Sequence, residues 1–213
     1  FIYSNMNANS IPYVSAILLA AGMSKRMHLG NKLLLDIKGK SVLRWCVENV
    51  LKSAASEILV VAGKDFPEIK SELNELEVSI LRNKNYFLGM STSIMTGIKA
   101  LNVNSEGALI LLADQPLLST HTINRFIETF QKRGKKIIAA HFKQFIGNPV
   151  LFHRSLFPDL LKIKGDVGAR TILKHYPEQI ATIEIPEVES FDIDTQDDFE
   201  KLKYLLDIST KIP

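Results

Sequence analysis

The chain has 213 residues, of which 46% are hydrophobic and 23% are charged, as is typical of one soluble globular domain. Its formal net charge of +3 is mild and its basic residues form no block, so the composition argues against nucleic acid as a partner. Because no apolar run approaches the roughly 18 residues that cross a bilayer and the first residues lack a secretory signal pattern, we expect a cytoplasmic protein without a membrane partner.

The sequence has a single cysteine, Cys46, which excludes an internal disulfide and a metal site built from several cysteines. Cys46 falls on the apolar face of an expected helix, so we place it in the core. Residues 1–12 are rich in Asn and Ser and show no periodicity. We therefore expect a flexible leader over residues 1–12, followed by one domain over residues 13–213.

Apolar strands and amphipathic helices alternate along the chain. In chain order, the pattern predicts a strand at 16–20, a helix around 43–51, strands at 57–62 and 78–81, a helix around 94–101, a strand at 108–112, a helix around 123–130, strands at 136–140 and 149–152, an edge strand at 180–185 and a closing helix around 199–206. This alternation predicts an α/β fold in which helices cover both faces of a mostly parallel sheet. In such folds ligands bind at the carboxyl ends of the strands.

The loop after the first expected strand combines small and basic residues. The stretch from Ala16 to Leu35 reads AILLAAGMSKRMHLGNKLLL. Ala20, Ala21 and Gly22 leave the backbone N–H groups open to close approach by a ligand. Lys25, Arg26 and Lys32 supply positive charge. Neither standard phosphate-loop pattern occurs here. The combination suits a nucleoside triphosphate, and the alternative is a simple strand-to-helix turn with solvated lysines.

Acidic residues follow two later strands. Asp114 ends an expected central strand, where its carboxylate needs a partner, and the candidates are a divalent cation, a lysine or the next segment that it would cap. Asp192 and Asp194 flank one apolar residue, so in an extended segment they point the same way. Thr195 and Asp198 resemble a capping box that starts the last helix. Capping does not account for both preceding aspartates.

Two further loops carry polar residues. Gly89, Ser91, Thr92 and Ser93 precede or begin a helix whose first N–H groups could hold an anion or a base edge, although this loop taken by itself favours capping of the helix by a serine. Asn148 before Pro149 predicts a turn. Asp166 and Arg170 stand four residues apart and could form a helix-surface ion pair.

Taken in order, these motifs resemble one family. L-A-A-G-x-S-x-R-M…K-L-L-L, G-x-S-x-S-I-x-x-G, A-D-Q-P-L, G-N-P-V-L-F, G-D-x-G-A-R and D-I-D-T-x-x-D resemble the molybdenum cofactor cytidylyltransferases, which belong to a larger group of nucleotidyltransferases that includes the molybdenum cofactor guanylyltransferases. The resemblance extends from about Ser15 to Leu206. It implies a three-layer α/β/α Rossmann-like fold and transfer of CMP from CTP to the terminal phosphate of the molybdenum (molybdopterin) cofactor, with release of pyrophosphate.

The resemblance also implies roles for individual residues. The catalytic residues would be Arg26 and Lys32, on the triphosphate, together with Asp114. The nucleotide site would comprise Leu19, Ala20, Ala21, Gly22, Arg26 and Lys32, with Asn83, Gly89, Ser91 and Ser93 near the base and ribose. Magnesium would be held by Asp114 and one of the later aspartates, by preference Asp194 rather than Asp192. The acceptor would face Gln115, Gly147, Asn148, Asp166 and Arg170.

Two details qualify the match. Family members read R-M-G, two residues and lysine, whereas this chain has one residue more between Arg26 and Lys32 and places its glycine, Gly30, later. Ala21 stands where guanylyl-transferring relatives usually have a second glycine, which favours CTP over GTP. The alternatives are a nucleotidyltransferase for another phosphorylated acceptor, such as a sugar or polyol phosphate, and a non-catalytic protein that delivers the pterin cofactor. A molybdoenzyme or its maturation factor is the expected protein partner.

Overall fold

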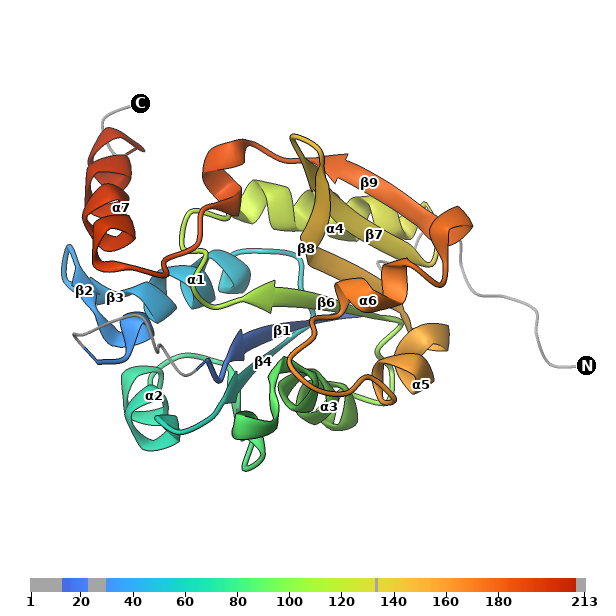
Figure 1. The fold of residues 1–213 in the computed structure, drawn as a ribbon, viewed down its shortest axis with the longest axis horizontal. Helices are drawn as coiled ribbons and strands as arrows, with labels where there is room; N and C mark the ends of the chain where they lie inside the picture. The colour runs from blue at the N-terminus through green and yellow to red at the C-terminus, as the bar shows by residue number, and fades with distance from the viewer. Residues whose placement is uncertain (1–12, 23–29, 133, 210–213) are drawn as a thin grey trace, which may run out of the picture.

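The computed structural model describes residues 13–22, 30–132 and 134–209, which form a central sheet between two layers of helices (Figure 1). The sheet has seven strands in the order β5-β4-β1-β6-β8-β7-β9. All neighbouring strands run parallel except β8, which is antiparallel to both β6 and β7. The strands are β1 Val14–Ala20, β4 Glu57–Ala62, β5 Ser79–Arg82, β6 Gly107–Leu112, β7 Ile137–Phe142, β8 Phe145–His153 and β9 Ile180–Glu184.

Helices cover both faces of this sheet (Figure 1). One core cluster joins the sheet to α1, α2, α4 and α7, and a second joins it to α3, α5 and α6. A two-stranded ribbon, β2 Asp36–Ile37 and β3 Lys40–Ser41, precedes α1. The helices are α1 Val42–Leu51, α2 Phe66–Glu72, α3 Met90–Ala100, α4 Thr120–Gln131, α5 Phe157–Leu160, α6 Arg170–Leu173 and α7 Gln196–Ser209.

The alternation of side chains along β1 explains why its sequence is an uninterrupted apolar run. Ala16, Leu18 and Ala20 belong to the core on the α1 side, whereas Ile17 between them belongs to the core on the α3 side. A strand buried on both faces has no solvent side on which polar residues could alternate. Cys46, on α1, is buried in the first of these cores as expected. No helix within the described ranges is long and apolar enough to cross a membrane.

The predicted α/β architecture is confirmed, including the three layers, the mostly parallel sheet and the edge position of the strand that begins at Ile180. The predicted turn at Asn148 and Pro149 is wrong, because both residues lie inside β8. They form a cis peptide bond at an irregularity of the β7–β8 ladder, where Ala139 pairs with Val150 but Ala140 pairs with Gly147. A proline that has no N–H to donate fits such an interruption of the ladder.

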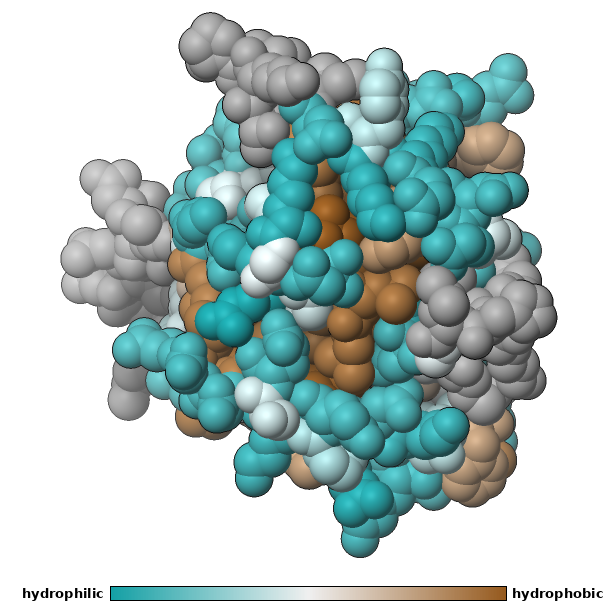
Figure 2. Space-filling model, turned by 90° about the vertical axis from the view of Figure 1, so that its left-hand side faces the viewer, coloured by the Kyte–Doolittle hydropathy of each residue, from teal (hydrophilic) through white to brown (hydrophobic). Residues whose placement is uncertain are grey.

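The carboxyl ends of β1, β4, β5 and β6 meet at one edge of the sheet, on the left in Figure 1. Antiparallel β8 begins at the same edge. Seen from that side, the molecule is hollowed, with hydrophobic residues in the hollow and hydrophilic residues around it (Figure 2). The loops that follow these four parallel strands therefore begin at the same edge of the sheet.

Close packing between α3 and β1 generates a prediction about stability. A Cβ atom added at Gly97 would lie 2.5 Å from Ile17 Cγ2, and Ile17 is fully buried. Gly97→Ala should therefore lower the free energy of unfolding by about 1–3 kcal/mol, as overpacking of a core does, despite the better helix propensity of alanine. Urea denaturation measures this change. Gly134→Ala is the control, because a Cβ there meets nothing within 4 Å, and equal stability of the two variants would contradict the packing argument.

Candidate functional site

The backbone around Lys32 is anchored before its side chain turns inward. Lys32 begins a short 3-10 turn, and Asn31 caps this turn by accepting a hydrogen bond from the Leu33 N–H at 3.0 Å. The Asn31 side chain also donates to Asp65 Oδ2 at 3.0 Å, and Asp65 belongs to the loop that follows β4. Leu33 is buried in the core. At Asn31, the chain that returns after β1 is thus tied to the loop that follows β4.

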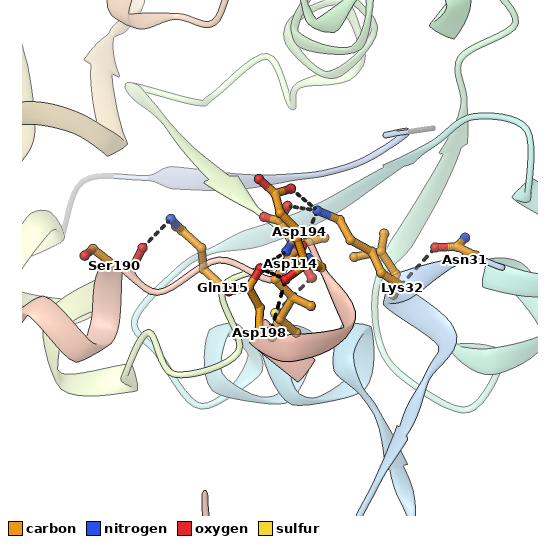
Figure 3. A network of polar contacts seen from close by, with 12 residues as sticks. Asn31, Lys32, Asp114, Gln115, Ser190, Asp194 and Asp198 are labelled. Carbon is orange, nitrogen blue, oxygen red and sulfur yellow. Dashed lines mark hydrogen bonds and ion pairs between the residues drawn. The ribbon is translucent and has the colours of Figure 1, made fainter. Parts of the chain in front are cut away.

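The Lys32 ammonium joins segments that are distant in sequence (Figure 3). Lys32 Nζ lies 2.7 Å from Asp114 Oδ2 and 3.1 Å from Asp194 Oδ1, and it also donates to the backbone carbonyl of Ile193. The Lys32 side chain is only 10% exposed, compared with 21% for Asp114 and 33% for Asp194. Of the candidate partners for Asp114, a lysine is therefore present, and Lys32 reaches it despite the longer loop.

Backbone contacts place the two carboxylates. Ala113, which precedes Asp114, donates its N–H to the carbonyl of Leu19 on β1. The Ile193 N–H donates to the Asp114 carbonyl at 3.2 Å, and the Ile193 side chain is fully buried. The segment before α7 therefore docks directly on the loop after β6. Because Ile193 points into the core, the aspartate on each side of it is directed away from the core.

The charges of the site shift the pKa values of several groups. Burial disfavours the charged form of Lys32, but attraction by Asp114 and Asp194 outweighs burial and raises its pKa above the ordinary value. Desolvation and the repulsion of Asp114 raise the pKa of Asp192, although part of that side chain reaches solvent. Burial raises the pKa of the Cys46 thiol, which contacts the carbonyl of Ala113 and stays neutral. The ammonium thus offsets a locally negative site.

The carboxylate pair fits a divalent cation. Asp114 Oδ1 is buried and accepts no hydrogen bond, and a carboxylate oxygen left without a donor is suited to a hard metal ion. The described residues contain no group of three or more His, Cys, Asp or Glu side chains arranged to hold a metal. A cation at Asp114 and Asp194 would therefore need further oxygen ligands from water or from a bound nucleotide. Asp194 forms an ion pair with Lys32 at 3.1 Å, whereas Asp192 interacts with Lys32 through longer-range attraction.

Gln115 lies beside this pair and is held from one side. Its Nε2 donates to the carbonyl of Ser190 at 3.3 Å, whereas its Oε1 is buried and has no partner (Figure 3). Asn148 Oδ1, on β8, is likewise buried without a partner. Both atoms are acceptors that a ligand with N–H or O–H donors would satisfy.

A second polar cluster, consisting of Asn83, Thr92 and Ser93, follows β5. Asn83 Nδ2 donates to Thr92 Oγ1 at 2.8 Å and to Ser93 Oγ at 2.9 Å, and its Oδ1 accepts from the Asn85 N–H. Asn83 and Ser93 are almost completely buried. Their contacts therefore fix the loop between β5 and α3, while the neighbouring Ser91 has a buried hydroxyl with no partner.

The N-terminus of α3 is capped by a distant loop rather than by a serine. Asp166 Oδ1 accepts from the Met90 N–H at 3.3 Å, and the Gly165 carbonyl accepts from the Ser91 N–H at 3.3 Å. Gly89 has φ of 104°, and a Cβ there would lie 2.5 Å from the Gly165 carbonyl carbon. Only glycine allows this approach. The expected capping by a serine is therefore wrong, and the first N–H groups of α3 already have partners.

Several of the remaining predicted residues lie at the carboxyl end of β1 and near the start of β8. Leu19 and Ala20 end β1, and Ala21 and Gly22 follow it. Asp166 does not pair with Arg170; instead both line a pocket of about 570 Å³. Gly147 lies in β8 next to Asn148. Arg26 and Lys25 lie outside the described residues.

Three residues that contact the predicted loops were not predicted from the sequence: Gly63, Asp65 and Tyr86. Asp65, which holds Asn31, follows a parallel strand, and that position was a usable signal. Gly63 lies where a Cβ would come within 2.9 Å of the Tyr86 side chain and 3.1 Å of Ala21 Cβ. The contact between Gly63 and Tyr86 left no recognisable pattern in the sequence.

The chain is similar in sequence to a known family and to named proteins. The family described as "MobA-like NTP transferase domain" matches residues 16–180. Nicotine blue oxidoreductase of Paenarthrobacter nicotinovorans is 28% identical over 206 residues, covering 92% of this chain and 100% of that protein. Molybdenum cofactor cytidylyltransferase of Escherichia coli is 26% identical over 189 residues, covering 87% and 93%.

Solved structures show the same fold. Rv0371c of Mycobacterium tuberculosis superimposes with a TM-score of 0.80 at 20% identity, covering 92% of this chain and 100% of that one. Its complex with manganese gives a TM-score of 0.76 at 19% identity, covering 90% and 98%. The expected nucleotidyltransferase-like architecture therefore has close structural counterparts.

The capping box before α7 generates a pH prediction. Asp198 Oδ2 accepts from the N–H groups of Thr195 and Asp194, and Thr195 Oγ1 accepts from the Asp198 N–H, so the expected capping box is confirmed. Partial burial would raise the pKa of Asp198, but these hydrogen bonds outweigh it and hold the pKa below the ordinary 3.8. A lowered carboxyl pKa stabilises the fold above about pH 4, and the stabilisation is lost as pH falls through the lower native value.

Asp198→Ala should therefore cost about 1 kcal/mol of unfolding free energy at pH 7 and much less near pH 3. Urea denaturation at both pH values measures the difference. Asp197→Ala is the matched control, because Asp197 lies in the same helical turn. A cost that is the same at both pH values would contradict the assigned role of the carboxylate.

Proposed function

Because the chain belongs to the family of MobA-like NTP transferase domains, we propose that it transfers CMP from CTP to a phosphorylated acceptor and releases pyrophosphate. The acceptor that we favour is the terminal phosphate of the molybdenum cofactor. The resemblance of the motif order and the Escherichia coli cytidylyltransferase relative support this choice. The family itself establishes only the nucleotidyltransferase class.

The observation that carries the proposal is the convergence of Lys32, Asp114 and Asp194 at the carboxyl edge of the sheet. Transfer of a nucleotidyl group brings two anions together and expels a third, so the protein must supply positive charge and alignment rather than a nucleophile. We assign Lys32 to the triphosphate and Asp114 with Asp194 to magnesium. Bound magnesium would offset the charge that develops between the α-phosphate and pyrophosphate.

The reaction is a direct displacement. An oxygen of the acceptor phosphate forms a bond to the α-phosphorus of CTP, and the bond from that phosphorus to the pyrophosphate oxygen breaks. The backbone after β1, at Ala21 and Gly22, has the small side chains that close approach of a nucleotide requires. We place the base and ribose near Gly89 and Ser91, where the buried Ser91 hydroxyl still lacks a partner.

The acceptor would lie on the opposite side of Asp114, near Gln115 and β8. The unpartnered oxygens of Gln115 and Asn148 favour an acceptor that presents N–H or O–H donors, as a pterin does. Arg170, on the pocket that it shares with Asp166, would supply charge for a phosphate. These features also suit a sugar or polyol phosphate, which is why the acceptor has to be tested directly.

A second candidate function is that of an oxidoreductase. It is suggested by nicotine blue oxidoreductase, all of which aligns with 92% of this chain. The Lys32 and carboxylate arrangement favours the transferase, because it provides charge neutralisation that a hydride or electron transfer does not require. The assay that separates the two measures pyrophosphate release with each of the four nucleoside triphosphates and magnesium, with and without molybdenum cofactor. Release that depends on the acceptor supports transfer. If no nucleotide gives pyrophosphate release with any acceptor, the result contradicts the transferase function. It would then favour a redox or cofactor-delivery role.

The carboxylate that ends β6 provides a specific test. Asp114→Asn should lower acceptor-dependent pyrophosphate release about a hundredfold or more, because it removes charge from the magnesium site. It should also lower the unfolding free energy by about 1–3 kcal/mol, since Lys32 loses a charged partner. Asp194→Asn should act in the same direction. Full activity of Asp114→Asn, or a larger catalytic loss in Asp198→Ala than in Asp194→Asn, would contradict the assignment.

The choice of base gives a further prediction. CTP should be preferred to GTP, because the Ala21 methyl group narrows a loop that must pass close to the base. One methyl group is worth about 1–3 kcal/mol, so the preference should be partial and Ala21→Gly should reduce it. The ratio of kcat/KM for the two nucleotides measures the effect. Equal ratios in the wild type and the variant would show that Ala21 does not select the base.

A further inference from the structure

We propose that the Lys32 ammonium is the resident counter-ion of the Asp114–Asp194 pair and opposes the binding of a free divalent cation. The cation would therefore enter the site together with the triphosphate instead of before it. This inference deepens the proposed function and rests on it for the identity of the nucleotide. Its test measures metal binding, which does not require the protein to transfer anything.

The Lys32 ammonium and a divalent cation would bind the same carboxylate oxygens. Lys32 Nζ lies 2.7 Å from Asp114 Oδ2 and 3.1 Å from Asp194 Oδ1, and these oxygens belong to the carboxylates that fit a divalent ion. A cation shared by both carboxylates has to displace the ammonium or stand next to it. Either event carries an electrostatic cost, which is large here because the Lys32 side chain is 10% exposed and poorly screened.

Several contacts hold Lys32 between the two carboxylates. Besides the two carboxylates, the ammonium donates to the Ile193 carbonyl, and the preceding residue is tied to Asp65. These contacts come from three different parts of the chain, so the ammonium is held between the two carboxylates. A free metal ion that approaches both carboxylates therefore meets the ammonium already in place.

A bound triphosphate would relieve the competition between the Lys32 ammonium and the metal ion. The two carboxylates carry two negative charges and Lys32 one positive charge, so one net negative charge remains to attract a bare cation. A bound triphosphate adds several negative charges and offers the ammonium oxygen acceptors in place of the carboxylates. The unpartnered Asp114 Oδ1 then remains for the metal. Nucleotide and metal should consequently bind with strong positive coupling.

Isothermal titration with Mn²⁺ alone, in the absence of nucleotide, tests the proposal. Lys32→Met removes the charge and keeps the length of the side chain, so Mn²⁺ should bind about tenfold more tightly than to the wild type, or more. Lys32→Arg keeps the charge and should leave binding weak. Lys99→Met is the matched control, because Lys99 is exposed on α3, and it should not change Mn²⁺ affinity. Unchanged or weaker binding to a folded Lys32→Met variant would overturn the proposal.

A measurement on the wild-type protein keeps the test decisive if Lys32→Met does not fold. The Mn²⁺ affinity should rise at least tenfold when a non-hydrolysable CTP analogue is present at saturation. Equal affinity with and without the analogue would overturn the proposal. If the protein binds no triphosphate at all, the proposed function fails, whereas tighter Mn²⁺ binding to Lys32→Met would still support the counter-ion role.

Discussion

The contact between one buried ammonium and two carboxylates organises the functional edge of this protein. Lys32 comes from the loop after β1, Asp114 from the loop after β6, and Asp194 from the segment before α7. Without the ammonium, two carboxylates would approach each other in a poorly solvated place, and without the carboxylates a lysine would be buried unpaired. Each charge therefore offsets the free-energy cost of burying the others. The contact also holds together three parts of the chain that are distant in sequence.

A second constraint fixes the loop before α3. Gly89 lies so close to Gly165 that no side chain fits between them, and Asp166 accepts from the first N–H of α3. The loop where we place the base and the loop where we place the acceptor are therefore in direct contact.

Proteins with quite different names are similar to this chain. The family match covers residues 16–180 and the superposition on Rv0371c covers 92% of the chain, whereas the names of its relatives include a cytidylyltransferase and an oxidoreductase. A scaffold that presents loops at one edge of a rigid sheet can change its acceptor through those loops alone. In the function we propose, the unpartnered oxygens of Gln115 and Asn148 are the atoms of this chain that would contact its acceptor.

The sequence by itself determined the strands of the main sheet, the longer helices, the layers and the loops that carry polar residues, because burial on both faces imposes continuous apolar runs and helical spacing that are visible locally. It also determined the capping box of Thr195 and Asp198, whose members are three residues apart. Only the tertiary structure decided that Asp114 pairs with Lys32, that Asp166 caps α3, and that Asn148 and Pro149 lie within β8. These outcomes depend on contacts between residues far apart in the chain, and local periodicity carries no information about which distant partner satisfies a buried charge or an open N–H group.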